Sequence, residues 1–461
     1  MPESMRERLV EERKRRFLHR GMLFAGVSGI SYGLYTAFLT LAQTQGVWGE
    51  WISGSAWGMG NPALSTFTVT FALAALAAAI NDLFSGVWSV LVCAKNGQLN
   101  DLLMTIRSKP GIVMMACSAI GGPIATIAYV VALNAAAASG NPGAIVPIAA
   151  LNCAIGTVLG RVLFNQGLEA HKVAGVIVCL LASALVGGTS YASIGPGVYF
   201  GCLFALIAAF GWGLEGCVAG FGTTLIDYRV GIAIRQSTAG ILELFVAFPI
   251  FVCVGEGFNE IGAIAGAAFT DPSLVLFLIS GLFAMPAFSF WYKGNSMCGT
   301  SLGMACNGTY AFWGPLFIWL LMGVFGIGGH STDYPPLKAV QWVGALVMIA
   351  GIFLIAVNPA GYLQKEGSRT AVRSKDPLTY AIILLFLDGR QRCAQDIISE
   401  LRPEYMDHKL LTVPDVAEML ATAKENGLLD ETGYEASGEE LQLLYRINEY
   451  GRSMTSRYLN R

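Results

Sequence analysis

Long apolar runs alternate with short polar segments over most of the chain, from residue 21 to residue 357. A helix needs about 20 mostly apolar residues to span the hydrocarbon core of a bilayer, and ten of the runs approach or exceed that length. We therefore predict ten transmembrane helices and an all-α membrane protein. The predicted helices cover residues 21–43, 64–92, 111–138, 144–165, 173–187, 197–218, 230–254, 273–291, 301–325 and 337–357.

The chain after residue 357 follows a different pattern. Residues 358–375 are polar and basic, as expected of a linker, and residues 376–461 have the mixed polarity of a soluble domain. DPLTYAIILLFLDG reads as an amphipathic helix whose apolar core is too short to cross a bilayer. CAQDIISEL and TVPDVAEMLATAKENGLL predict two more helices, and LQLLYRINEYGRSMTSRYL predicts a strand followed by a helix. This order resembles a small α+β winged-helix domain.

Composition agrees with the membrane assignment. Hydrophobic residues make up 54% of the 461 positions and charged residues only 13%, which is too little charge to cover a soluble protein of this size. Residues 1–20 are basic and run into the first apolar segment without a small-residue cleavage site, so we expect no cleavable signal peptide. The ten cysteines show no metal-binding spacing, and we expect no disulfide, metal site or cofactor.

Lysine and arginine divide the loops into two sets. Five loops contain almost none: 44–63, 139–143, 188–196, 255–272 and 326–338, where Lys338 is the single case. The alternate loops, the helix ends beside them and the two ends of the chain hold Arg6, Arg8, Arg13, Lys14, Arg15, Arg16, Arg20, Lys95, Arg107, Lys109, Arg161, Lys172, Arg229, Arg235, Lys293, Lys365, Arg369, Arg373 and Lys375. Because basic loops stay on the cytoplasmic side, we predict a multi-pass protein of the cytoplasmic (inner) membrane with both termini in the cytoplasm.

The two halves of the apolar region, residues 21–188 and 189–357, resemble each other. Asp82 and Glu243 lie in matching frames 161 positions apart, each followed by Leu-Phe. At an offset of 163, Pro123, Tyr129 and Gly160 recur as Pro286, Tyr292 and Gly323. Five helices in each half is an odd number, so the two halves must insert in opposite orientations. Inverted repeats are typical of secondary transporters, whose substrate sites lie near the membrane midplane.

Several motifs resemble those of the drug/metabolite transporter superfamily, in its ten-helix EamA-like form. Trp212-Gly213 opens the second half, QWVGALVMIAGIFLI (residues 341–355) closes it, and HKVAGVIVCLLASALV (residues 171–186) closes the first half. The similarity covers about residues 21–357 and rests on the order and repetition of the motifs. It implies alternating-access transport of a small molecule. Many members have a glutamate where this chain has Gln166, so a role tied to that carboxylate does not carry over.

Three carboxylates lie inside the apolar runs. Asp82 and Glu243 are near the middle of their predicted helices, and Glu215 follows Trp212-Gly213. An ionised carboxylate at the bilayer centre costs about 2.5–3.5 kcal/mol on insertion scales, so we expect these side chains to face the bundle interior. They are either proton carriers or ligands of a cationic substrate, or else neutral packing residues. The functional reading is favoured for Glu215, and both readings stay open for Asp82 and Glu243.

Aromatic and amide residues complete the candidate substrate site. Aromatic faces can hold an ammonium group or the apolar face of a sugar, and amides can bind hydroxyls or carboxylates. Each residue also has an alternative role in helix packing or at the membrane interface. The set comprises Tyr35, Tyr129, Asn134, Asn152, Trp212, Tyr292, Asn307, Tyr310 and Trp313.

These patterns lead to two hypotheses about function. The first is a secondary transporter for a small polar metabolite (an amine, amino acid, sugar or nucleoside), with proton coupling as an option. The alternative is a membrane sensor or receptor that signals through its C-terminal domain. No HExxH or GxxxxGK[ST] motif is present, and we predict that the protein is not an enzyme.

The charge of the C-terminal domain bears on its partners. Residues 376–461 contain nine Lys/Arg and fifteen Asp/Glu, a net charge of −6. Duplex binding depends mainly on basic side chains that neutralise phosphates. We therefore expect a regulatory or protein-contact module that does not bind DNA.

Overall fold

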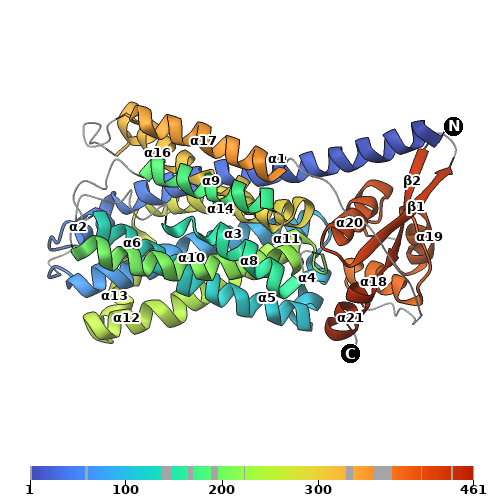
Figure 1. Ribbon diagram of the computed structural model, residues 1–461. Helices are drawn as coiled ribbons and strands as arrows, with labels where there is room; N and C mark the ends of the chain where they lie inside the picture. The colour runs from blue at the N-terminus through green and yellow to red at the C-terminus, as the bar shows by residue number, and fades with distance from the viewer. Residues whose placement is uncertain are drawn as a thin grey trace.

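The computed structural model describes residues 3–57, 61–137, 148–164, 170–187, 196–222, 224–328, 336–356, 376–405, 408–437 and 440–459. Long helices pack side by side in a bundle, and a small mixed domain lies against one end of it (Figure 1). Both chain termini lie at this end, where the N-terminal part of the first helix runs alongside the small domain. The predicted linker, residues 358–375, lies outside the described residues.

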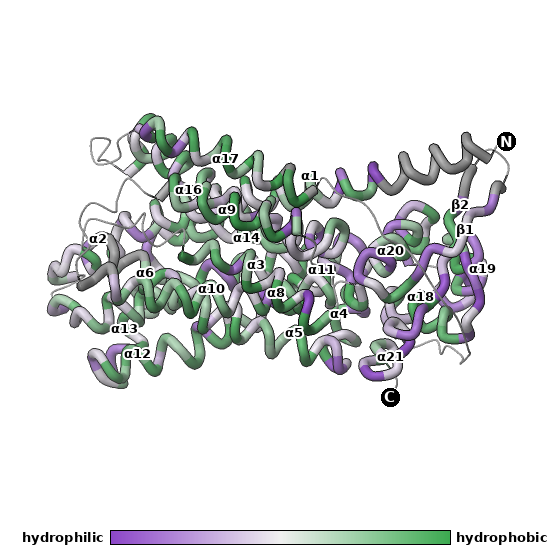
Figure 2. Tube along the Cα trace, in the orientation of Figure 1, coloured by the Kyte–Doolittle hydropathy of each residue, from purple (hydrophilic) through white to green (hydrophobic). Residues whose placement is uncertain are grey.

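Six stretches of helix within the described part of the chain are long and apolar enough to cross a membrane. They lie within α1 (Glu3–Gln43), η1–α3 (Thr68–Ala72 and Leu73–Lys95), α5–η2–α6 (Lys109–Ala119, Ile120–Thr126 and Ile127–Ala137), α10 (Pro196–Gly222), α11–η5–α12 (Tyr228–Leu242, Glu243–Ala247 and Phe248–Gly255) and α14 (Leu274–Cys298). The three segments labelled η in this set are π-helical turns. Apolar residues dominate the bundle (Figure 2), which confirms an all-α membrane-embedded body.

Shorter or interrupted helices occupy the other four apolar segments. They are α8 (Asn152–Phe164), α9 (Ala170–Gly187), α15–α16–η6 (Thr300–Asn307, Tyr310–Ile318 and Trp319–Val324) and α17 (Ala339–Ala356). Three further helices, α2 (Gly46–Ile52), α4 (Leu99–Ile106) and α13 (Glu260–Thr270), lie in segments that the pattern predicts as loops. They form because they too have apolar residues to bury, such as Trp48 and Trp51 in α2 and Ile264 in α13.

The main helix contacts in the bundle are repeated when the two halves are exchanged. The first helix of the first half, α1, packs against α14 and α16 of the second half. The first helix of the second half, α10, packs against α6 and α8 of the first half. The second helix of each half packs against its counterpart, α3 against α11, and so does the last, α9 against α17. Glycines allow close approach at such contacts: a Cβ on Gly351 of α17 would lie 2.7 Å from Cys179 Sγ of α9.

The C-terminal domain contains three helices, a β-hairpin and a closing helix. The elements are α18 (Leu378–Leu385), a 3-10 turn η8 (Phe386–Asp388), α19 (Ala394–Tyr405), α20 (Val413–Glu425), β1 (Leu429–Ser437), β2 (Glu440–Ile447) and α21 (Glu449–Tyr458). The strands are antiparallel, with Leu429 opposite Ile447 and an irregularity between Glu431 and Gly433. The pattern predicts the helices and β2 but misses β1, whose polar DETGYEAS sequence lacks regular alternation.

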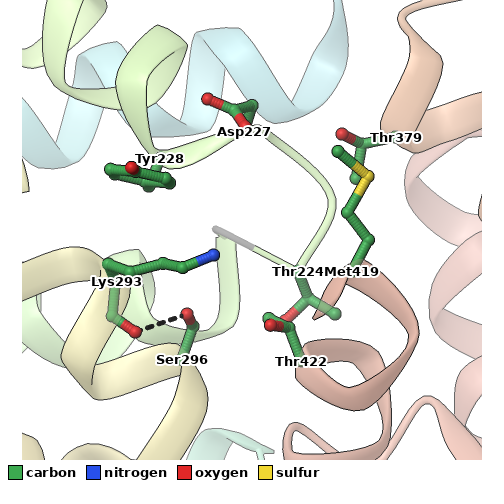
Figure 3. Close-up of a pocket in the computed structure, with 8 residues that line it drawn as sticks. All are labelled: Thr224, Asp227, Tyr228, Lys293, Ser296, Thr379, Met419 and Thr422. Carbon is green, nitrogen blue, oxygen red and sulfur yellow. Dashed lines mark hydrogen bonds between the residues drawn. The ribbon is translucent and has the colours of Figure 1, made fainter. Parts of the chain in front are cut away.

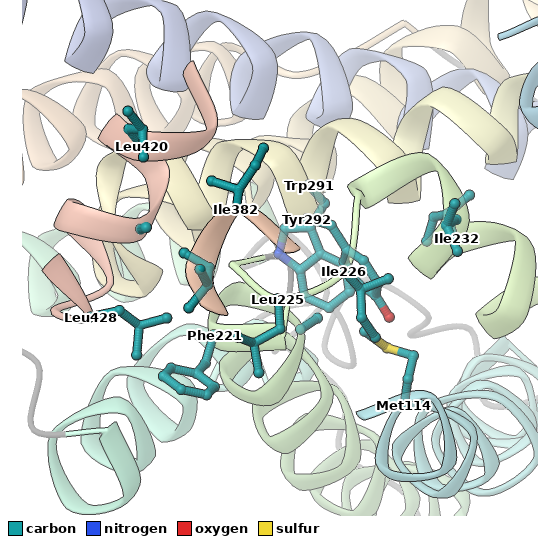
Figure 4. Packing of buried hydrophobic residues seen from close by; sticks show 14 of the residues in the cluster. Met114, Phe221, Leu225, Ile226, Ile232, Trp291, Tyr292, Ile382, Leu420 and Leu428 are labelled. Atoms are coloured by element: carbon teal, nitrogen blue, oxygen red, sulfur yellow. The ribbon is translucent and has the colours of Figure 1, made fainter. Parts of the chain in front are cut away.

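The amphipathic interpretation of α18 is wrong. Every residue from Leu378 to Leu384 is buried, because the helix lies between the rest of the domain and the end of the bundle. Its Ile382 belongs, with Leu420 and Leu428, to the same buried cluster as Phe221 and Leu225 of the bundle, and Leu428 lies beside Phe221 (Figure 4). One continuous hydrophobic core therefore runs from the bundle into the domain.

Candidate functional site

A buried arginine joins two of the three predicted carboxylates. Arg235 Nε donates to Glu215 Oε1 at 2.7 Å and its Nη2 donates to Oε2 at 3.3 Å, a two-pronged contact. Arg235 Nη1 donates to Asp82 Oδ2 at 2.7 Å. The exposed fractions are 0% for Arg235, 1% for Glu215 and 2% for Asp82. The planar guanidinium is well suited to hold two carboxylates at once.

The assignment of Arg235 to a cytoplasmic loop is wrong. The residue lies about two turns inside α11 and is fully buried. Its sequence context, YRVGIAIRQST, contains polar residues on both sides and therefore reads as the edge of an apolar run. The positive charge of Arg235 instead pairs with the carboxylates of Asp82 and Glu215, which are distant in sequence but lie on neighbouring helices.

Neighbouring side chains hold the guanidinium and Glu215 in place. The Phe288 ring lies under the guanidinium, 4.2 Å from Arg235 Cζ to the ring centroid, in a cation–π contact. The Tyr292 hydroxyl donates to Glu215 Oε1 at 2.8 Å. Arg235 Nη1 also donates to the amide oxygen of Gln236. The ion pairs are thus backed by contacts from α11 and α14.

Asp82 is tied into a second set of polar contacts. Asn81 Nδ2 donates to Asp82 Oδ1 at 3.1 Å, and the Ser280 hydroxyl donates to Asn81 Oδ1 at 2.7 Å. Ser280 lies on α14, while Asn81 and Asp82 lie on α3. Together with Arg235 on α11 and Glu215 on α10, the network therefore joins four helices from both halves.

Glu243 is different from the other two carboxylates. It is fully buried at the start of the π-helical turn η5, and no described donor bonds either of its carboxylate oxygens. It still lies close enough to Asp82, Arg235 and Glu215 for electrostatic interaction. Of the three carboxylates, Asp82 and Glu215 are bonded to the guanidinium of Arg235, and Glu243 is not bonded to it in the described residues. We call Asp82, Glu215, Arg235 and Glu243 the acidic cluster.

Two glycines of the π-helical turn η2 make room for the acidic cluster. A Cβ on Gly121 would lie 1.7 Å from Glu215 Oε2, and a Cβ on Gly122 would lie 3.4 Å from Glu243 Oε1. The turn also leaves the Gly121 carbonyl free to accept a hydrogen bond from Trp212 Nε1 at 3.1 Å. Such π-helical turns occur frequently at functional sites.

An aromatic cavity adjoins the acidic cluster across the Phe288 ring, and it has room for about one water molecule. Its lining residues are Tyr32, Asn152, Trp212, Phe288, Trp291, Asn307 and Tyr310. Trp291 Nε1 and the Tyr310 hydroxyl have no partner within the described part of the chain, although both residues are buried. A polar ligand would satisfy these groups.

Most of the predicted site residues meet at these two places. Asn152, Trp212, Asn307 and Tyr310 line the cavity. Tyr35 and Tyr129 flank it, since their ring centroids lie 4.6 Å from Tyr32 and 4.9 Å from Trp212. Tyr292 contacts the acidic cluster, because its hydroxyl donates to Glu215.

One predicted residue is not brought to the site, and the side chain of a second lies outside the described residues. Trp313 packs away from the cavity, with its Cβ 2.5 Å from the position of a Cβ on Gly33 and its ring stacked on Phe317. Asn134 lies in α6, but its side chain is outside the described residues. Sequence reasoning missed Tyr32, Phe288 and Trp291, which read as ordinary apolar positions of their helices. The sequence holds a signal for Tyr32 alone of these three, because SYGLY (residues 31–35) resembles GWGLE (residues 211–215) in the other half.

A second pocket lies at the junction of the bundle and the C-terminal domain (Figure 3). It is lined by Thr224, Asp227, Tyr228, Lys293, Ser296, Thr379, Met419 and Thr422. Lys293 Nζ lies 4.9 Å from the Tyr228 ring centroid and forms an ion pair with Glu418 of α20. Burial raises the pKa of the Glu418 carboxyl, but the cations of Lys293 and Arg20 lower it by more, so this pKa lies below its usual value.

Comparisons with known proteins add little. No family model and no curated protein matches the chain. One solved structure, described only as "Crystal structure of protein", matches with a TM-score of 0.46 and 18% sequence identity over 72% of this chain and 96% of its own. A likeness at this level carries no argument about function, which must come from the residues themselves.

Proposed function

We propose that the protein is a secondary transporter that moves a small polar metabolite across the cytoplasmic membrane. The observation that carries the proposal is the acidic cluster, which is fully buried within membrane-length helices. Ionisable residues inside a membrane are costly and typically mark an ion or substrate pathway. A purely structural role would be filled at lower cost by apolar residues of similar volume.

The architecture proposed for this function is ten transmembrane helices in two inverted five-helix repeats. The main helix contacts, which are repeated when the halves are exchanged, support it. The shorter helices are compatible with it, since the 18 residues of α9 or α17 rise about 27 Å, close to the thickness of the hydrocarbon core. The resemblance to EamA-like transporters supports the same arrangement.

Within the acidic cluster, we assign proton exchange to Glu243. Arg235 and its hydrogen-bond partners hold Glu215 and Asp82, whereas Glu243 has no described donor. A buried carboxylate without a donor is far less costly when it carries a proton. This assignment replaces Glu215, which the sequence favours, because the structure gives Glu215 a fixed cation and the Tyr292 hydroxyl.

The substrate class that fits best is an amine or an amino acid. The acidic cluster contains more carboxylates than cations, which favours a ligand with an ammonium group. The adjoining cavity offers aromatic faces to that group. It also offers a carboxylate three donors without a described partner: Trp291 Nε1 and the hydroxyls of Tyr32 and Tyr310. Because the cavity holds about one water, substrate entry requires the two halves to move apart.

The test begins with a thermal-shift screen of the purified protein against amines, amino acids, sugars and nucleosides, since a ligand of the folded state raises its apparent stability. The strongest hit is then radiolabelled for uptake into proteoliposomes. We expect accumulation driven by an imposed pH gradient. Glu243→Gln should abolish this accumulation but retain exchange of labelled for unlabelled substrate, because exchange needs no net proton movement. Glu260→Gln, in α13 at the far end of the bundle, is the matched control.

A second candidate function, a sensor or receptor, is favoured by the continuous core between the bundle and the C-terminal domain. Ligand binding without any flux or exchange would support the sensor and refute the transporter. In either case we propose that the winged-helix-like domain is a regulatory module and not a DNA reader. Its α20, the helix that would enter the major groove, packs on α14 and presents Glu418 to the bundle.

A further inference from the structure

The C-terminal domain bonds to helices of both halves at one end of the bundle. On the first-half side, His408 Nε2 is 2.8 Å from Asp101 Oδ2 of α4, and the Tyr380 hydroxyl is 2.9 Å from Ser108 Oγ. On the second-half side, Asn426 Nδ2 donates to the carbonyl of Ser296, in α14, at 2.8 Å. The domain is therefore not attached to one half alone.

Glu418 makes the most direct connection between the halves. One carboxylate oxygen lies 2.7 Å from Arg20 Nη2 of α1, and the other pairs with Lys293 Nζ of α14. The side chains of Lys293 and Glu418 are only 10% and 18% exposed, so water screens this pair less than a surface pair. Next to this ion pair α1 and α14 are in contact, since a Cβ on Gly21 would lie 2.8 Å from Met297 Cβ.

Apolar contacts reinforce the same junction. Leu428 of the domain lies beside Phe221, near the end of α10 (Figure 4). Leu420 of the domain and Leu225, in the loop after α10, belong to the same buried cluster. All four residues are at most 5% exposed. Separating the domain from the bundle would expose these side chains to water, which makes the docked arrangement a stable one.

We infer that the docked C-terminal domain is an autoinhibitory clamp, which holds α1 and α14 together and keeps the cytoplasmic side of the bundle closed. This regulatory role rests on the proposed transport function. In alternating access, the halves must separate at each end in turn. Because Glu418 binds one cation from each half, α1 and α14 cannot part at this end until the carboxylate releases one of them. Undocking of the domain is then a required step of opening.

The test uses the full-length protein and a native reporter. Cys298, the last residue of α14, is half-buried beside α1: a Cβ on Gly21 would lie 3.1 Å from Cys298 Cβ. Its rate of modification by N-ethylmaleimide, followed peptide by peptide with mass spectrometry, reports separation of α1 from α14. Hydrogen exchange of α20 reports undocking in the same sample. Neither measurement needs a substrate, so failure of the clamp is distinguishable from failure of the transport proposal.

The variant is Glu418→Gln, which removes both ion pairs while keeping the side-chain shape. We expect faster exchange in α20 and about a tenfold rise in the Cys298 modification rate, as would follow from 1.4 kcal/mol of lost docking free energy. The matched control is Glu425→Gln, on the same helix, where Glu425 pairs with Lys424 of the domain itself. The control should leave the hydrogen exchange of α20 at the wild-type rate. Because Glu425 also acts electrostatically on Cys298, the Cys298 rate in this control is the baseline that Glu418→Gln must exceed.

A second variant, Glu418→Gln with Asn426→Ala, also removes the hydrogen bond to Ser296. It should raise both rates further. The clamp is refuted if Cys298 reacts at the wild-type rate in a variant whose α20 exchanges freely. It is equally refuted if the double variant leaves α20 as protected as in the wild type, because Glu418 and Asn426 then do not hold the domain.

Discussion

Removal of Arg235 should destabilise the protein more than removal of either carboxylate that it binds, Glu215 or Asp82. Arg235→Met keeps most of the side-chain volume but deletes three hydrogen bonds to carboxylate oxygens, at 2.7, 3.3 and 2.7 Å. Glu215 and Asp82 would then be buried without a cation, at 1% and 2% exposure. Breaking a buried pair by removing one partner costs about 3–5 kcal/mol.

The change should be visible as a lower melting temperature of the purified protein in detergent, followed by tryptophan fluorescence. At about 2–4 °C per kcal/mol for a domain of 150–250 residues, the expected fall is on the order of 10 °C. The melting temperature of Arg235→Lys should lie between those of the wild type and Arg235→Met, since an ammonium group retains the charge but cannot form the two-pronged contact with Glu215.

The decisive comparison is a triple variant, Arg235→Met with Glu215→Gln and Asp82→Asn. If uncompensated charge causes the loss, neutralising both carboxylates should recover most of the melting temperature, because neutral replacements of buried ion pairs are often tolerated. An unchanged melting temperature in Arg235→Met would refute the reasoning. So would a triple variant no more stable than the single one, because the loss would then come from packing.

Three further predictions test other parts of the structure. Gly121→Ala should lower stability by about 1–3 kcal/mol in thermal melts, because its Cβ would lie 1.7 Å from a buried carboxylate oxygen, whereas Gly26→Ala, with nothing within 4 Å, should not. A cysteine at Ser55 should react with an impermeant thiol reagent from outside intact cells and one at Glu404 should not; the reverse result would overturn the orientation. The pKa of Glu418 is lowered in the docked state, so docking should be strongest above the ordinary glutamate pKa of about 4.3 and be lost as the pH falls through the lowered pKa. Hydrogen exchange of α20 measures docking, and weaker protection at pH 7 than at pH 5 would contradict the prediction.

The sequence predicts the apolar helices well, because a long run without charge has few other stable forms. It also predicts that Asp82, Glu215 and Glu243 are buried, since no partner for them exists in lipid, and all three are. It does not predict their partner. Arg235 is 153 positions from Asp82, and only the packing of α3 against α11 brings them together.

The ion pair of Lys293 and the burial of α18 could not be predicted from the sequence for a related reason. Lys293, near the end of α14, has the pattern of a lysine that extends to the membrane surface, but it pairs with Glu418. The polar residues at the ends of α18 predict a solvent-facing side, but every residue from Leu378 to Leu384 is buried. In both cases the missing information is the docking of one domain on another, which leaves no periodic signal in either segment.

The π-helical turn η2 has a consequence for insertions and deletions in this protein. Relative to a continuous α-helix, such a turn contains about one extra residue, which rotates everything after it by about 100°. The ring of Tyr129, 4.9 Å from Trp212, is positioned by that rotation. Deleting a single residue between Ile120 and Thr126 would restore regular α-helix and turn Tyr129 away from the cavity, without changing any residue that lines it. The length of this segment is thus as much a determinant of the site as the identity of its side chains.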